Sequence, residues 1–241
     1  MTDWKKVNYL RKGQSFNYDY QIELPEPLAS WDVYDYWEHQ RTRHMAKTLK
    51  KDDLMIDIGA EYGWQTAVYQ KMCKLIIVEP NVDYFNNIRQ IWEKNCDSKP
   101  EAIYVGLMSD KDLNNPELLT DWFDGTGELV TGLKYRYIGK DKGLPQMKVD
   151  TLVKKLKKTP TAITMDIEGA ELLVLRGAEK LLNKGIKVWV SVHPDLAEKT
   201  YDIKPNEIHD YLKSLGYKGK LLGTDHEEHW YYEKKQKESD K

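Results

Sequence analysis

Short apolar runs alternate with amphipathic stretches along most of this chain, and this alternation predicts its elements. Strands are expected at 54–58, 75–79, 102–105, 161–166 and 187–193. Helices are expected near 64–72 and 82–95, from about 168 through 182, and near 205–215. Short buried strands that alternate with helices predict an α/β fold with a mostly parallel sheet covered on both faces. Two further strand signals, within 217–232, predict a C-terminal antiparallel hairpin.

The first 50 residues lie outside this alternation and are expected to form an N-terminal helical extension or cap. Ser30 is placed to cap a helix that continues to about residue 49. Three aromatic side chains recur at every third position of this helix and give it one aromatic face: Trp31, Tyr34 and Trp37. That face either packs the helix onto the sheet or covers a ligand as a lid.

A glycine-rich insertion and a charged tail complete the predicted organisation. Residues 108–148 contain five glycines and only weak strand signals, at 129–131 and 135–138. An insertion of this length in a compact domain usually has a function. Residues 233–241 are expected to be a disordered tail, which leaves 51–232 as the main domain.

Composition narrows the classes of protein to which the chain can belong. The 241 residues carry a net charge of −2, so no overall basic field favours nucleic acid or anionic lipid. No apolar run approaches the roughly 18 residues of a membrane span, and the first residues lack the apolar core of a signal peptide. Cys73 and Cys96 fit no zinc pattern, so we expect a cytoplasmic protein in a reducing compartment.

A glycine turn between the first strand and its helix carries the strongest chemical signal. The turn runs from Asp57 to Gly63 with Gly59 inside it, and Glu79 ends the next apolar run. Glycines let the backbone approach a ligand, and a carboxylate at the second strand end can bind two ribose hydroxyls. The order Asp-x-Gly-x-x-x-Gly differs from the Gly-x-Gly-x-x-Gly that cradles a pyrophosphate. It suits a cationic nucleoside such as S-adenosylmethionine, whereas the plainer alternative is a tight turn without a ligand.

Further polar groups are predicted at the same edge of the sheet, because ligands bind outside the carboxyl ends of parallel strands. Asp166 ends the fourth strand, and in extended backbone Glu168 would point to the same side. Two such carboxylates favour a shared proton, a metal ion or a cationic ligand. Glu171 is explained equally well by a preference for the helix N-terminus. His193 ends the fifth strand and is either a general base that titrates near neutral pH or a turn residue.

Four sequence blocks make the chain resemble the FkbM-type S-adenosylmethionine-dependent methyltransferases. The blocks are Asp57–Gly63, Val78–Asn81, Val149–Leu152 and Met165–Ala178. The resemblance covers about residues 54–217 and implies a Rossmann-like class I methyltransferase fold. It also implies methyl transfer to a hydroxyl of a sugar, a glycan or a similar small molecule. The chain departs from the family at position 164, where threonine replaces the usual lysine, and at position 61, where glutamate replaces the more frequent asparagine.

The resemblance and the motifs together assign roles to residues. The residues expected to bind S-adenosylmethionine are Asp57, Gly59, Ala60, Gly63, Glu79, Pro80, Asn81 and Ser109. His193 is the expected base, while Asp166 and Glu168 orient the acceptor or stabilise the imidazolium. A divalent metal held by these three residues is an open alternative. The insertion at 108–148 and the N-terminal helix are expected to form the acceptor side of the cleft.

Three other functions compete with an O-methyltransferase. A nicotinamide-dependent oxidoreductase would share Glu79, but the chain lacks the third glycine of that turn and a suitable Tyr-x-x-x-Lys pair. A nucleic-acid or amino methyltransferase often carries Asn/Asp-Pro-Pro-aromatic after the fourth strand, where this chain has Asp-Ile-Glu-Gly. A module that binds the cofactor without catalysis remains compatible with the sequence.

Overall fold

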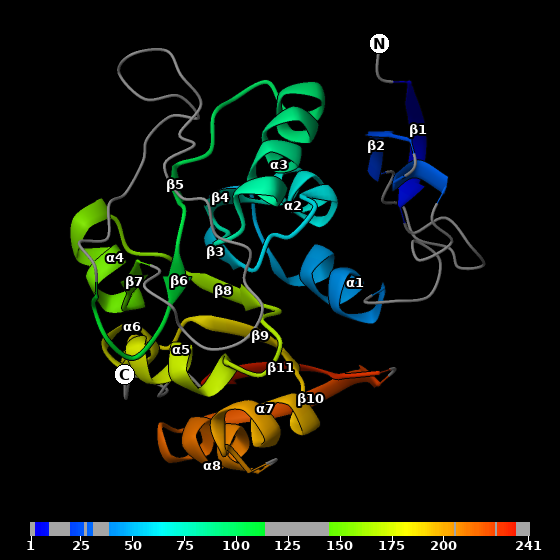
Figure 1. Ribbon diagram of the computed structural model, residues 1–241. Coiled ribbons are helices and arrows are strands. Elements are labelled where there is room, and N and C mark those ends of the chain that lie inside the picture. The colour runs from blue at the N-terminus through cyan, green and yellow to red at the C-terminus, as the bar shows by residue number, and fades with distance from the viewer. Residues whose placement is uncertain are drawn as a thin grey trace, which may run out of the picture.

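A seven-stranded sheet forms the centre of the molecule in the computed structural model (Figure 1). The structure describes residues 3–9, 20–26, 28–30, 39–113, 145–204, 206–224 and 226–234. The sheet order is β10-β11-β9-β8-β3-β4-β5. Its strands are β3 (Leu54–Ile58), β4 (Lys74–Val78), β5 (Ala102–Tyr104), β8 (Ala162–Met165), β9 (Lys187–Val192), β10 (Tyr217–Thr224) and β11 (Glu228–Lys234).

Five neighbouring strands of the sheet, β9, β8, β3, β4 and β5, are parallel. The C-terminal hairpin adds the antiparallel strand β11 beside β9. This arrangement confirms the predicted fold class, including the hairpin. A shorter parallel pair, β6 (Leu107–Met108) and β7 (Gln146–Met147), lies outside the main sheet. Because β8 lies between β3 and β9, the carboxyl ends of these strands meet at one edge.

Two apolar cores lie on the two faces of the sheet, because successive side chains of a strand point to opposite sides. Met55 of β3 belongs to one core and Ile56 to the other. The first core packs against α1 (His39–Thr48), α2 (Trp64–Gln70) and α3 (Val82–Asn95). The second packs against α4 (Val149–Leu156), α5 (Glu171–Gly177), α6 (Glu179–Asn183), α7 (Pro194–Tyr201) and α8 (Glu207–Ser214).

The N-terminal extension differs from the predicted helical cap. It contains an antiparallel hairpin of β1 (Trp4–Tyr9) and β2 (Tyr20–Pro25), followed by a 3-10 turn, η1 (Leu28–Ser30). Alternate residues of β2 are buried, among them Ile22 and Leu24, and they join the core formed by α2 and α3. The expected aromatic face of Trp31, Tyr34 and Trp37 lies outside the described residues.

Smaller differences concern element ends. The helix expected to run through 182 is divided at Ala178 into α5 and α6, and β11 extends two residues into the expected tail. Of the 108–148 insertion, residues 114–144 lie outside the described residues, as do 235–241 of the tail. None of the helices in the described part of the chain has the length and apolarity that a membrane crossing requires.

Candidate active site

One cavity of about 750 Å³ opens at the carboxyl edge of the sheet. It is lined both by the glycine turn and by the ends of β8 and β9. The sequence-predicted residues that line it are Gly59, Ala60, Glu79, Pro80, Asn81, Ser109, Asp166, Glu168 and His193. The structure therefore brings together the predicted cofactor side and the predicted catalytic side in a single space.

The glycines of the turn are required by close backbone approaches. Gly59 and Gly63 both have φ of +82°, a conformation that side chains disfavour. A Cβ on Gly59 would lie 2.1 Å from the carbonyl oxygen of Asp166, and one on Gly63 would lie 2.7 Å from the Cα of Ile88. The turn thus packs tightly on the end of β8 and on α3, and its residues 59–62 line the cavity while Gly63 does not.

Asp57 lies beneath the turn and does not line the cavity. Its buried carboxylate accepts a hydrogen bond of 2.7 Å from the hydroxyl of Thr66 in α2. Burial raises the pKa of Asp57 to about 6, although Thr66 and the charge of Arg41 oppose the shift. In this structure Asp57 connects β3 to α2, and direct contact with a cofactor stays a prediction.

Glu79 is held at the cavity wall by two backbone groups. Its Oε2 accepts from the backbone N–H of Glu61 at 2.9 Å, and its Oε1 accepts from that of Asn81 at 2.7 Å. Burial raises the pKa of Glu79 to about 7, against these two hydrogen bonds. Each carboxylate oxygen has a further lone pair, so this orientation leaves acceptors for two ligand hydroxyls.

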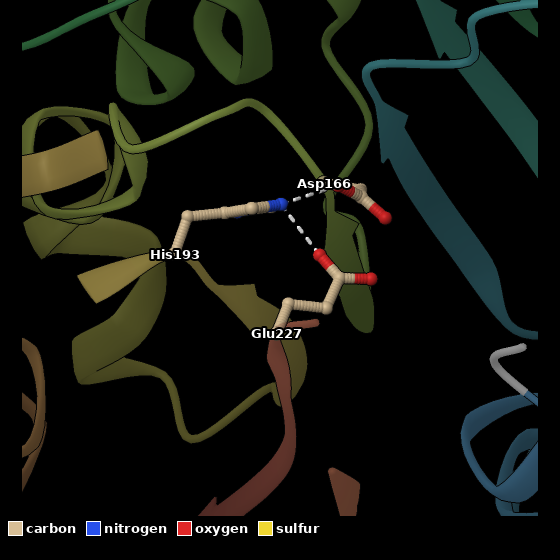
Figure 2. A group of neighbouring side chains, drawn as sticks. All are labelled: Asp166, His193 and Glu227. Carbon is tan, nitrogen blue, oxygen red and sulfur yellow. Dashed lines mark ion pairs between the residues drawn. The ribbon is translucent and has the colours of Figure 1, made fainter. Parts of the chain in front are cut away.

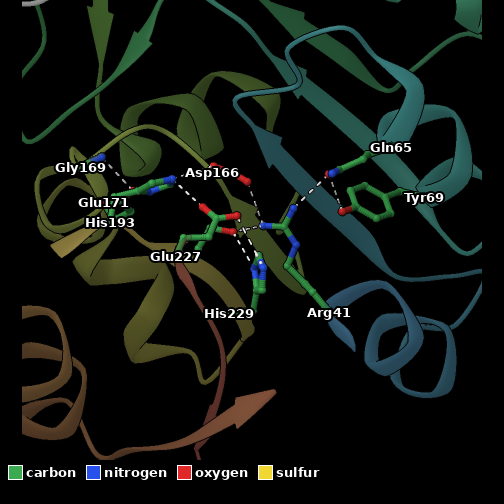
Figure 3. Close-up of polar contacts among 10 residues, drawn as sticks. Arg41, Gln65, Tyr69, Asp166, Gly169, Glu171, His193, Glu227 and His229 are labelled. Carbon is green, nitrogen blue, oxygen red and sulfur yellow. Dashed lines mark hydrogen bonds and ion pairs between the residues drawn. The ribbon is translucent and has the colours of Figure 1, made fainter. Parts of the chain in front are cut away.

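His193 lies at the centre of the second wall, where three carboxylates surround its ring (Figure 2, Figure 3). β8 and β9 are adjacent and parallel, so Asp166 and His193 converge as predicted from the usual strand order. The Nδ1 of His193 lies 2.8 Å from Oε1 of Glu171. Its Nε2 lies 2.5 Å from Oε2 of Glu227 and 3.5 Å from Oδ1 of Asp166.

The expectation that His193 titrates near neutral pH is wrong for this arrangement. Burial lowers the pKa of His193, but the hydrogen bonds with Glu171 and Glu227 and the charge of Asp166 outweigh it. The pKa is raised to about 11. This shift favours the imidazolium over the neutral ring, and a role for His193 as the general base stays a prediction.

Glu168 lies beyond the end of β8, so the extended backbone that its prediction assumed is not present there, although both Asp166 and Glu168 line the cavity. The chain turns at Glu168, which has φ of +57° and is exposed at the mouth of the cavity. The second carboxylate beside Asp166 and His193 is instead Glu227, which is only 3% exposed and precedes β11. The alternating side-chain rule fails here because it holds only while the strand continues.

Arg41 connects the N-terminal extension to this wall (Figure 3). The residue is in α1 and is 1% exposed. Its Nη1 lies 3.5 Å from Oδ2 of Asp166 and donates a hydrogen bond to the hydroxyl of Ser191. Its Nη2 donates to Oε1 of Gln65 at 3.0 Å. A cation from a distant helix thus faces the carboxylate that ends β8.

Arg41, Glu171 and Glu227 are the site residues that sequence reasoning missed. Arg41 and Glu227 lie far along the chain from their partners and follow no local pattern. Glu171 carried a weak signal, because it is a charged residue that opens an apolar helix. Its side chain is 0% exposed and accepts from the backbone N–H of Gly169 at 3.0 Å.

The fold and the site define a class I methyltransferase domain that uses S-adenosylmethionine. The family model for the methyltransferase FkbM domain matches residues 57–218. The chain therefore belongs to the FkbM methyltransferase family, which confirms the resemblance and makes S-adenosylmethionine its cofactor. No curated protein sequence matches the chain.

Solved structures of other methyltransferases resemble this chain at low sequence identity. The methyltransferase FkbM from Methylobacillus flagellatus KT is 16% identical, with a TM-score of 0.50. The match covers 77% of this chain but 44% of that one, so the chain spans less than half the length of this relative. An rRNA methylase from Streptococcus thermophilus is 12% identical, with coverage of 82% and 96% and a TM-score of 0.48.

Proposed function

We propose that this chain transfers the methyl group of S-adenosylmethionine to a hydroxyl of a neutral, polyhydroxylated acceptor such as a sugar or glycan. The observation that carries the proposal is a shared cavity, which is lined by Glu79 on one wall and by Asp166 and His193 on the other. Ligand pockets measure about 300–1,000 Å³. At about 750 Å³, the cavity has room for a cofactor with part of an acceptor beside it.

The charge of the cavity favours a neutral acceptor over nucleic acid. Among its described lining residues, the basic side chains of Lys111, His193 and His226 are outnumbered by five acidic ones: Glu61, Glu79, Asp166, Glu168 and Glu227. An acidic wall attracts the sulfonium and ammonium of the cofactor and repels a phosphate backbone. The alternative of a nucleic-acid methyltransferase is therefore less compatible with this cavity.

The proposed reaction requires little from the protein beyond holding the methyl donor and the acceptor hydroxyl in line. The hydroxyl oxygen attacks the methyl carbon, its O–C bond forms as the C–S bond breaks, and sulfur leaves as a neutral thioether. The hydroxyl proton passes to Asp166, whose side chain is 25% exposed and lies between Arg41 and His193. Because the sulfonium is already strongly electrophilic, a weak proton acceptor in line with the hydroxyl suffices.

We expect transfer of labelled methyl from S-adenosylmethionine to neutral saccharides, detected by radioactivity and by a mass increase of one methylene in the product. The purified chain would be incubated with a glycan library, with RNA, and with amine-rich peptides in parallel. Product only in the RNA or peptide reactions would overturn the proposed acceptor. Cofactor binding without product in any reaction would instead favour a non-catalytic module.

Cofactor binding is expected to depend on an ionised Glu79. Glu79→Gln should weaken S-adenosylmethionine binding by about 10- to 100-fold, because it removes charge-assisted hydrogen bonds worth roughly 1.5–3 kcal/mol. The pKa of Glu79 is raised to about 7, so the carboxylate predominates only above this pH. Wild-type affinity should therefore fall as the pH decreases through 7, and Glu79→Gln should flatten that part of the profile.

Calorimetry at a series of pH values would measure both effects. Glu93→Gln is the matched control, since Glu93 is an exposed residue of α3 paired with Arg89 and does not line the cavity. A folded Glu79→Gln protein with wild-type affinity and the same pH dependence would show that Glu79 does not bind the ribose.

A further inference from the structure

Three ligand-bearing side chains converge at the wall opposite Glu79 (Figure 2). Asp166 follows β8, His193 follows β9, and Glu227 precedes β11, so each comes from a different segment. One atom from each, two carboxylate oxygens and an imidazole nitrogen, lies within 4.8 Å of the others. All three residues line the cavity, so this mixed set of ligands is accessible to a small molecule.

The imidazole of His193 has the support that metal-binding histidines usually have. Metal ligands of this type commonly donate their second ring N–H to a carboxylate, which directs the other nitrogen at the ion. Here Oε1 of Glu171 lies 2.8 Å from Nδ1, on the side of the ring away from Glu227. The backbone N–H of Gly169 fixes that carboxylate at 3.0 Å. Nε2 is thereby directed toward Asp166 and Glu227.

An independent observation is an orphaned buried oxygen behind the histidine. Oε2 of Glu171 is buried and has no hydrogen-bond partner among the described residues, and the whole side chain is 0% exposed. A carboxylate in this position is costly unless positive charge lies nearby. Among the described residues, three carboxylates here lie near the guanidinium of Arg41 and the imidazoles of His193 and His229, and a divalent cation would add positive charge beside the buried carboxylates.

We propose that Asp166, His193 and Glu227 bind a divalent metal ion at the acceptor wall of the cavity. Carboxylates suit hard ions and imidazole suits first-row transition ions, so a mixed set of this kind fits Mn²⁺ or a similar ion. The ion takes the place of the proton that Nε2 of His193 shares with Oε2 of Glu227, and that proton is released to solvent. Three protein ligands leave coordination positions open.

The role of this ion rests on the proposed function, whereas its binding does not. In a methyltransferase, an open position beside the cofactor would hold the acceptor hydroxyl and lower the cost of losing its proton. Asp166 would then contribute as a ligand and as a neighbour of the hydroxyl. Metal binding itself is measurable in the absence of any acceptor.

The test is Mn²⁺ binding to the full chain after removal of metals with a chelator, followed by calorimetry and electron paramagnetic resonance. We expect one bound ion in the wild type and at least about tenfold weaker binding in Glu227→Gln and in His193→Gln. Glu228→Gln is the matched control, because this neighbouring carboxylate accepts from Nε1 of Trp230 and does not line the cavity. Circular dichroism and S-adenosylmethionine binding would establish that each variant is folded.

Two outcomes would overturn the metal site: no Mn²⁺ binding at millimolar concentration, or equal binding in the wild type and both ligand variants. The proposed function fails separately. Specific Mn²⁺ binding without methyl transfer to any hydroxyl would reject the function and keep the metal site. Transfer that persists in chelator, in a chain that does not bind Mn²⁺, would reject the metal site and keep the function.

Discussion

Replacement of His193 by alanine is expected to lower the turnover of methyl transfer by about 10²-fold, because a misplacement of about 1 Å at the reacting groups costs roughly that much. The affinity for S-adenosylmethionine should change little, because the predicted cofactor residues are on the other wall of the cavity. The imidazole contacts Asp166, Glu171 and Glu227 at once. Its loss leaves three carboxylates without their common partner and moves the groups that face the acceptor hydroxyl.

Steady-state assays with labelled donor and a saccharide acceptor would measure this effect alongside calorimetry for the cofactor. His209→Ala is a suitable control, because His209 is a partly buried histidine of α8 that bonds Tyr232 and does not line the cavity. Near-normal turnover of a folded His193→Ala protein would exclude the histidine from catalysis. Asp166 would then be the remaining candidate on that wall.

Gly59→Ala is expected to destabilise the fold by about 2–4 kcal/mol. The left-handed backbone costs a residue with a Cβ about 1–2 kcal/mol. The new methyl would also lie 2.1 Å from the carbonyl oxygen of Asp166, which is backbone and cannot rotate away. Separation of the turn from β8 should weaken cofactor binding as well, since both border the cavity.

Gly216→Ala separates these two contributions. Gly216 has φ of +85°, but a Cβ there would meet no described atom within 4 Å. This variant should lose only about 1–2 kcal/mol of unfolding free energy, from backbone strain alone. Urea denaturation of both variants gives the comparison. Equal decreases in the free energy of unfolding for the two variants would show that the close approach of the turn to β8 does not constrain residue 59.

The parallel strands were predictable because burial on both faces makes them continuous apolar runs. The run expected at 187–193 is β9 at Lys187–Val192, and the run at 54–58 is β3. The division of α5 from α6 at Ala178 was not predictable, since alanine favours a continuous helix. The β1–β2 hairpin was missed because its strands carry many polar residues and gain their stability from tertiary packing on α2 and α3.

Some residues of the site were likewise predictable from the sequence, and others were not. Glu79, Asp166 and His193 were found because each follows an apolar run, and parallel topology collects such positions at one edge. Glu227 and Arg41 were not found because their place depends on the hairpin and on α1, far along the chain. The extended backbone assumed for Glu168 was wrong because β8 ends at Met165 and Glu168 itself adopts a left-handed conformation.

Arg41 links the N-terminal extension to the main domain, so the two are expected to evolve together. Its guanidinium, from the N-terminal extension, contacts Gln65, Asp166 and Ser191 from three parts of the sheet domain. Recombination that exchanged the glycine-turn domain alone would place Arg41 against a domain without these matched groups, and a guanidinium buried without a counterion is costly. Selection should therefore keep the extension and the domain together as one inherited unit, although only the domain carries the family's sequence blocks.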